Sequence, residues 1–487
     1  MAASVVVPNA YLLVVSVAAA RSLGAAGLGR QSLIAFSVAA ASTLAGAGGF
    51  VAVMRAVATA LGDDDLRGAR AMVRAARRAH LVTGTVAGFA VSVPVLWGAG
   101  PRAAWLLGGL VTLLATLQTV PAAVLVGAQR WREANGVGLL TGALAVPATL
   151  LVLERGGGIE GLFAVEAAVV AVNLVWTGAL ARRALEGEGA AVGTDLRLAG
   201  HARFAAVSTA GVAVTVLVWR RSELVLLAWF SNDVEVARYS VAFAVSALLL
   251  TLSERFAATM TPAFTRLVHA GDRDGLAAAR ARGVRILLLL SLPFVAGVAG
   301  AGPGGIRLLY GDTFARSGTV LAILLVALAA LPVWSVSAAV LAAHRDAVSP
   351  LMAGGAGAAL NIGLALWLVP RDGAVGAAAA SAGGQLAAIA LLHHLVRRRV
   401  GPMTWDVASL GRAGLVAVGT GVAAWLPSHW LGGAAGVVLG LLAGATVLVA
   451  LGTSTRPLPR ADVTWLAASL GGRLGERATV LLARAAR

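Results

Sequence analysis

Fourteen long apolar runs fill most of this sequence of 487 residues and constrain its fold more than any other feature. Most are close to the ~20 residues that a helix needs to cross the hydrocarbon core of a bilayer. They are too long, and alternate too little, to be strands of a membrane barrel. The sequence therefore predicts an all-α polytopic membrane protein with about fourteen transmembrane helices. The runs are 4–20, 31–53, 80–99, 104–127, 136–153, 162–181, 205–230, 236–260, 286–302, 318–342, 350–369, 375–396, 410–427 and 431–451.

The composition excludes several classes of protein. Charged residues make up 13% of the chain, about half of the ~25% typical of soluble domains, which excludes a soluble enzyme. The chain has no cysteine, which excludes a disulfide framework, a cysteine-ligated metal and a thiol nucleophile. It also lacks a Walker-type phosphate loop. We therefore expect a protein that is not an enzyme, with no catalytic residue, metal or cofactor.

The positive charge of the chain indicates its orientation. All 39 basic residues are arginine, and they lie in short segments between the apolar runs. No soluble basic face results, so we expect no nucleic-acid partner. With the N-terminus inside, cytoplasmic segments hold 27 arginines and outer segments hold 8, an excess that predicts cytoplasmic N- and C-termini. The first run has no basic segment before it, so we interpret it as a retained helix rather than a signal peptide.

The sequence also contains an internal repeat. Segment 127–183 aligns on segment 342–398 without gaps at an offset of 215, and the Gly-Asp pair at 62–63 aligns on that at 271–272 at an offset of 209. Each copy contains six runs, an even number, so the copies enter the membrane in the same direction. Such parallel repeats predict two six-helix lobes with a cavity between them near the midplane, exposed alternately to the two sides.

The repeat sets the expected domain boundaries. Two further helices follow the second lobe without partners in the repeat, and a basic tail follows them along the inner membrane face. The expected parts are an N-terminal lobe at 1–183, a cytoplasmic linker at 184–204, a C-terminal lobe at 205–398, transmembrane helices 13 and 14 at 399–452 and a basic cytoplasmic tail at 453–487.

Charged residues within the seventh run are the first candidate site. Arg220, Arg221 and Glu223 lie near its middle, where a charge costs roughly 2.5–3.5 kcal/mol and should face protein or water. Arg220 and Glu223 are three residues apart and can pair on one helix face. Two interpretations stay open, namely a self-satisfied ion pair, or guanidinium groups that bind an anionic substrate.

Three more charged residues complete the candidate set. Glu254 and Arg255 lie in the inner half of the eighth run, and Arg55 lies at the end of the second. The two arginines either anchor their helices at the inner surface or face the cavity and bind substrate. A buried glutamate can carry a proton, so Glu223 and Glu254 are the candidates for ion coupling.

Several stretches together resemble a known family. These are RSLGAAGLG at 21–29, VEVARYSVA at 234–242, TPAFTRL at 261–267, LLYGDTF at 308–314, LNI at 360–362 and VPRDGAVGAA at 369–378. They are similar to the polysaccharide (O-antigen/exopolysaccharide) flippases of the multidrug/oligosaccharidyl-lipid/polysaccharide (MOP) exporter superfamily. The family has an Arg-x-Asp pattern near the seventh helix, and Arg221 to Glu223 matches it with Glu in place of Asp.

The resemblance implies a fold and a function. The fold is a V-shaped bundle of two lobes in the bacterial cytoplasmic membrane. The function is alternating-access transfer of an undecaprenyl-diphosphate-linked oligosaccharide from the inner to the outer leaflet, for surface polysaccharide synthesis. Arg220, Arg221, Arg255 and Arg55 would bind the diphosphate or acidic sugars. The implied partners are this lipid-linked glycan, membrane lipids, a polysaccharide polymerase and glycosyltransferases, and the chain would act as a monomer.

Two other cargoes are open. A lipid II flippase carries the same diphosphate-lipid chemistry on a peptidoglycan precursor. A cation-coupled drug exporter of the MATE type needs acidic groups in its cavity, but the first five runs contain no carboxylate. Four arginines counted in or at the ends of the runs (Arg55, Arg220, Arg221 and Arg255) outnumber the three glutamates within them, and a cationic cavity repels cations. A polysaccharide polymerase would need large outer loops, which this sequence lacks.

Overall fold

The computed structural model describes residues 3–63, 65–186, 209, 211–213, 216, 222–457, 459 and 462. Those residues are helical apart from turns and short connections, and they contain no strand. The predicted all-α class is therefore confirmed. The chain divides into two compact units. The first contains α1–α5, most of α7 and the first turn of α8, and the second contains the rest of α8 and α9–α13.

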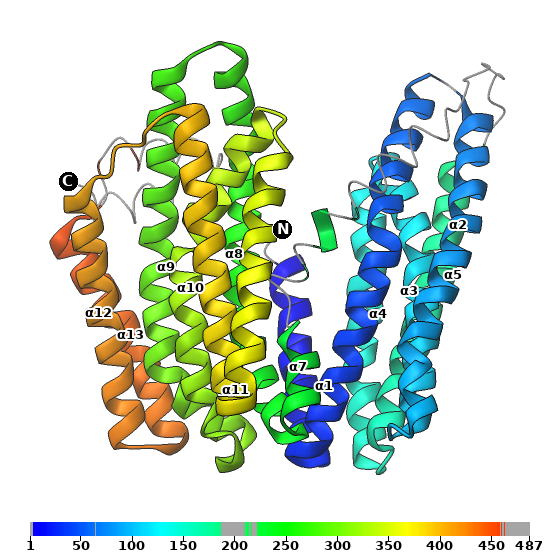
Figure 1. Cartoon of the computed structure of the whole chain (residues 1–487), viewed down its shortest axis with the longest axis horizontal. Helices are drawn as coiled ribbons and strands as arrows, with labels where there is room; N and C mark the ends of the chain where they lie inside the picture. The colour runs from blue at the N-terminus through cyan, green and yellow to red at the C-terminus, as the bar shows by residue number, and fades with distance from the viewer. Residues whose placement is uncertain are drawn as a thin grey trace. The chain divides into compact units, whose positions relative to one another are not determined.

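The first unit is built from five long helices and one short one (Figure 1). They are α1 (Ala3–Gly62), α2 (Leu66–Ser92), α3 (Arg102–Gly127), α4 (Trp131–Glu154), α5 (Gly158–Ala184) and α7 (Glu223–Phe230). A short 3₁₀ helix, Val93–Trp97, follows α2. The backbones of α2 and α3 touch where Gly88 faces Gly109, since a Cβ on Gly88 would lie 2.5 Å from the Gly109 carbonyl oxygen. Small residues allow this close approach of membrane helices.

The second unit contains α8 to α13. Its helices are α8 (Asp233–His269), α9 (Arg273–Tyr310), α10 (Ser317–Ala343), α11 (Val348–Val400), α12 (Val407–Trp430) and α13 (Gly433–Thr455), with a 3₁₀ turn at Asp312–Phe314. The last two helices lie beside α9 (Figure 1). The backbones touch there as well, since a Cβ on Gly300 of α9 would lie 2.3 Å from the carbonyl oxygen of Gly421 of α12.

Ten helices among the described residues are long and apolar enough to cross a membrane. Two of these, α1 and α11, each contain two of the predicted runs. Each reverses direction at one glycine, Gly24 with φ 68° and Gly373 with φ 55°. These φ values lie in the left-handed region, which glycine adopts without steric cost. Where the sequence predicts short outer loops, the chain therefore turns within what is nearly one continuous helix.

Helix caps refine the register of the repeat. Asp65 accepts a hydrogen bond from Gly68 N at 2.8 Å at the start of α2, and Asp272 accepts one from Gly275 N at 2.8 Å at the start of α9. The carboxylate satisfies a backbone N–H that has no partner inside the helix. The two caps are 207 residues apart, so the alignment of the Gly-Asp pairs at an offset of 209 is two residues out of register. Gly158, with φ 61°, and Gly373 are 215 residues apart, the offset that the later segments predict.

Candidate functional site

The arginine-rich segments gather at one end of each unit, which is called the basic end below. In the first unit it comprises the connections from α1 to α2 and from α3 to α4, with the end of α5. In the second it comprises the connections from α8 to α9, from α10 to α11 and from α11 to α12. The sequence predicts this end to be cytoplasmic, and its ion pairs form the best-defined polar chemistry of the described residues.

The predicted site residues can be followed only in part. Arg55 lies on α1 one to two turns from the basic end, and its side chain is exposed. Glu223 is the first residue of α7 and is 2% exposed. Arg220 and Arg221 lie outside the described residues, and Glu254 and Arg255 lie on α8 with side chains outside the described part. Substrate binding by the arginines and ion coupling by the glutamates therefore stay predictions.

The position of Glu223 suits a buried carboxylate. It lies in the first turn of α7, where the partial positive charge of a helix N-terminus stabilises an anion. Leu224 and Leu227 of the same helix are fully buried. A carboxylate in such surroundings is costly unless it is hydrogen-bonded, paired or protonated, and proton uptake by Glu223 stays a prediction.

An ion pair at the opposite end of the first unit joins α1 to the start of α8. Arg30 Nε lies 2.7 Å from Asp233 Oδ2, with side chains 53% and 32% exposed. The neighbouring Gly29 lies so close to Asp233 that a Cβ would fall within 1.8 Å of its carbonyl oxygen. Because the pair is largely solvated, it contributes little to stability by itself. The close backbone contact at Gly29 is therefore the tighter link between α1 and the start of α8.

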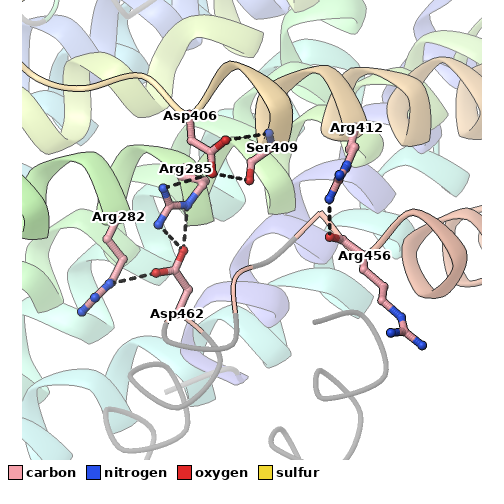
Figure 2. A network of polar contacts seen from close by, with 7 residues as sticks. All are labelled: Arg282, Arg285, Asp406, Ser409, Arg412, Arg456 and Asp462. Atoms are coloured by element: carbon pink, nitrogen blue, oxygen red, sulfur yellow. Dashed lines mark hydrogen bonds and ion pairs between the residues drawn. The ribbon is translucent and has the colours of Figure 1, made fainter. Parts of the chain in front are cut away.

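At the basic end of the second unit, three charged side chains form a network (Figure 2). The carboxylate of Asp462, beyond α13, is 1% exposed. Its Oδ1 accepts a hydrogen bond from Arg282 Nε at 2.9 Å, and its Oδ2 accepts one from Arg285 Nε at 2.7 Å. Arg285 Nη2 also lies 2.5 Å from Oδ2. Two guanidinium groups of α9 thus neutralise one buried carboxylate. They hold the chain at Asp462, in the segment after α13, against the second unit.

The same network reaches the start of α12. Asp406 caps this helix, since its Oδ1 accepts from Ser409 N at 3.0 Å and its Oδ2 from Ser409 Oγ at 2.7 Å. Asp406 Oδ2 lies 3.7 Å from Arg285 Nη1. Figure 2 shows Arg285 between the two carboxylates, so this one arginine links α9, α12 and the segment after α13.

Arg280 is a buried, hydrogen-bonded arginine whose place in the interior was not expected from the sequence. The sequence places it in a basic cytoplasmic loop, but it is 1% exposed. Its Nη1 donates to Gly401 O at 3.2 Å, and its Nη2 lies 3.3 Å from His393 Nδ1, which joins α9 to the end of α11. The available signal was helical periodicity, because Arg280 lies on the buried stripe of α9 with Leu276, Val284 and Leu287.

A further cap holds the α10–α11 connection. Asp346 accepts hydrogen bonds from Ser349 N at 3.0 Å and Ser349 Oγ at 2.7 Å, and it pairs with Arg399 at the end of α11. Burial alone would raise the pKa of Asp346, but the hydrogen bonds from Ser349 and the charge of Arg399 outweigh it, so the pKa lies below its ordinary value.

Among the described residues, no cluster of three His, Asp or Glu side chains could hold a metal ion.

Comparison with solved structures identifies the fold. The chain is similar to a multidrug resistance MATE family transporter of the MOP superfamily in an inward-facing conformation, with TM-score 0.67, 16% identity, and 81% of this chain and 94% of that one covered. It is also similar to the lipid II flippase MurJ in an inward closed conformation, with TM-score 0.66, 13% identity, and coverage of 90% and 98%. The chain is therefore a polytopic membrane protein with the fold of the MOP exporter superfamily.

Sequence comparison adds a narrower finding. Residues 204–444 match the family model of the lipid II flippase MurJ. No curated protein sequence matches the chain. A MOP superfamily transporter from Pyrococcus furiosus, described as having a binding pocket of reversed polarity that suggests a different function, shares the fold with TM-score 0.56, 16% identity, and coverage of 82% and 92%. The resemblance of the fold to that of the superfamily is thus confirmed, while the narrower assignment to polysaccharide flippases stays a prediction.

Proposed function

We propose that this chain is a flippase that moves a polyprenyl-diphosphate-linked saccharide from the inner to the outer leaflet by alternating access. The match of residues 204–444 to the MurJ family model carries the proposal. The matched region begins directly before the seventh predicted run and contains five of the six candidate residues, all except Arg55. It therefore covers the part of the chain in which the sequence places charged groups within the membrane.

The sign of these charges favours an anionic cargo. Arg220, Arg221 and Arg255 are the membrane arginines of the matched region, and guanidinium groups bind diphosphate oxygens in a bidentate manner. A drug cation would instead need a carboxylate-lined cavity. The P. furiosus transporter, whose described pocket polarity suggests a different function, supports the use of charge to separate cargo classes within this fold.

Two diphosphate-linked cargoes remain, and each has its own support. The family-model match favours lipid II, the peptidoglycan precursor. The stretches that resemble polysaccharide flippases, including VPRDGAVGAA at 369–378, favour an oligosaccharide for surface polysaccharide synthesis. Both cargoes present the same diphosphate to the arginines. They differ in the saccharide, so an assay must compare the two saccharides to distinguish them.

A reconstitution experiment tests the proposal. The purified chain is placed in vesicles with fluorescent lipid II, or with a fluorescent undecaprenyl-diphosphate oligosaccharide, and lipid reaching the opposite leaflet is measured. We expect transfer of at least one of them, and loss of transfer in R220E, R221E and R255E. The matched control R273E reverses an exposed arginine at the start of α9 and should keep wild-type transfer.

The possible results separate the cargoes. Transfer of lipid II alone assigns the peptidoglycan precursor, and transfer of the oligosaccharide alone assigns surface polysaccharide. Wild-type transfer by all three reversal variants would contradict the proposal that these arginines bind the cargo. Export of a cationic drug with no lipid transfer would overturn the proposal in favour of the MATE-type alternative.

The proposed direction of transfer depends on the orientation of the chain. We propose that the basic end is cytoplasmic, because an excess of arginine marks cytoplasmic loops. The chain has no cysteine, so a single introduced thiol reports its own side of the membrane. In intact cells, an impermeant maleimide should label W97C, at the opposite end of the first unit, and not R74C, at the basic end. Labelling of R74C alone would reverse the orientation.

A further inference from the structure

A groove at the basic end of the first unit is lined by none of the residues proposed for transport. It is a cavity of about 320 Å³ between α2, α3 and α5. Its walls are almost entirely aliphatic and include Leu117 and Pro121 of α3 with Leu174 and Val175 of α5. Val175 is 69% exposed, so the groove opens onto the surface of the unit. In a membrane helix, such an exposed aliphatic wall suits contact with acyl chains.

Two arginines lie on this aliphatic groove. Arg77 of α2 and Arg182 of the last turn of α5 both line it. Both side chains are exposed. Arg182 Nε donates only a long bond of 3.4 Å to Gly178 O of its own helix. Among the described residues, neither guanidinium forms an ion pair and no carboxylate lines the groove. An apolar slot bordered by two cations that have no ion-pair partner among the described residues is complementary to a molecule with an acyl chain and an anionic head.

We propose that this groove binds an anionic glycerophospholipid of the surrounding bilayer, with an acyl chain along α3 and α5 and its phosphate on Arg77 and Arg182. Guanidinium groups are good phosphate ligands. Basic pockets between transmembrane helices on the cytoplasmic side are suited to anionic lipid headgroups. A zwitterionic lipid fits less well, because its ammonium group finds no carboxylate in the groove.

None of the residues proposed for cargo binding or ion coupling lines this groove. All groove residues fall between Val73 and Leu185, whereas the family-model match begins at residue 204. The groove also lies within the first unit alone. Lipid binding here can therefore be measured without any transfer of cargo, and failure of either proposal leaves the other intact.

Neighbouring arginines on the same two helices provide matched controls. Arg78 and Arg183 follow the groove arginines directly and are also exposed, but they do not line the groove. The double variants R77A/R182A and R78A/R183A therefore remove the same charge from the same helices. Because each arginine near an anionic membrane surface contributes about 1 kcal/mol, the first pair should weaken binding of phosphatidylglycerol about 30-fold. The second should change it less than threefold.

A second variant tests the aliphatic part of the groove without altering charge. Gly178 lines the groove, and a Cβ at this position would meet no atom within 4 Å. The Cβ of leucine in G178L therefore meets open space, and leucine is a better helix former than glycine, so the helix should fold. Gly142 on α4 has equally free space and lies outside the groove, which makes G142L the control. We expect G178L to lose bound phospholipid and G142L to keep it.

Native mass spectrometry of the full chain, titrated with phosphatidylglycerol, phosphatidylcholine or undecaprenyl phosphate, measures these affinities. The proposal predicts preference for phosphatidylglycerol, lost in R77A/R182A and G178L. Equal weakening by both arginine pairs would mean diffuse charge attraction and would overturn it. Unchanged binding of phosphatidylglycerol in G178L would exclude the groove as the binding site of the acyl chain. Preference for undecaprenyl phosphate would show that the groove holds a cargo lipid, which also contradicts the proposal.

Discussion

Asp462 holds the segment after α13 against α9, and its removal should release that segment. The substitution D462N keeps the shape of the side chain but removes its charge. Three contacts from Arg282 and Arg285, at 2.9, 2.7 and 2.5 Å, lose their ionic partner. Breaking a buried pair costs about 3–5 kcal/mol. The arginine side chains are 30% and 17% exposed, so water offsets part of this loss, and we expect about 2 kcal/mol.

A buried proline near Asp462 supplies the assay. Pro457 is buried, and the chain has no cysteine, so P457C introduces a single shielded thiol. The thiol reacts with maleimide only when the segment opens, and its labelling rate then reports the open population. A loss of about 2 kcal/mol raises this population about 30-fold. We therefore expect P457C/D462N to label about 30 times faster than P457C.

Two further variants decide whether the ion pairs cause the change. Arg412 Nη1 donates a bond of 3.4 Å to Arg456 O in the same region, but it is exposed, so R412A should change the rate less than threefold. The double variant R282A/R285A removes the other side of the Asp462 contacts and leaves its buried carboxylate without counter-charge, so it should speed labelling at least as much as D462N. If P457C and P457C/D462N label at rates within threefold of each other, the network does not hold the segment.

Two other features give predictions of their own. The pKa of Asp346 is lowered, so its contribution to stability is present above its ordinary pKa of 3.8 and is lost as the pH falls through its lower folded value. The wild type should therefore unfold at higher temperature than D346N at pH 7, with the difference shrinking below pH 4, whereas a constant difference would contradict the assignment. At the α9–α12 contact, G300L forces a side chain against the carbonyl oxygen of Gly421 and should cost about 1–3 kcal/mol or more. G414L, at an α12 glycine with open space, should keep the wild-type yield and melting temperature, and equal behaviour of the two variants would refute tight packing at Gly300.

The helices could be predicted from sequence because each needs about 20 apolar residues in a row. A turn between the first two runs was predicted as well, but not that it lies at the single residue Gly24, because a glycine within an apolar helix looks the same in sequence whether its φ is negative or positive. The register of the repeat was two residues out at its start for a related reason. Several Asp residues near a helix start look alike in sequence. Only the hydrogen bond from a backbone N–H shows which of them caps the helix, as for Asp65 and Asp272.

The charged contacts were predictable to different degrees. Arg280 lies on the buried stripe of α9, so periodicity alone could have moved it from the loop into the interior. The contacts of Asp462 with α9 join residues 177 and 180 positions apart, and no local pattern indicates such a pairing. The orientation of the chain and the roles of Arg220, Arg221 and Arg255 stay predictions, because they depend on a membrane and a cargo.

The single-glycine reversals in α1 and α11 restrict where foreign sequence can be inserted. At Gly24 and Gly373 the helices turn with hardly any chain outside them, so an epitope placed there would have to unwind helical turns on both sides. The connection at residues 98–101, between α2 and α3, is free of helix and is the better point for a tag at the end of the first unit where Gly24 lies. Reporters of topology or of transport should therefore be introduced there.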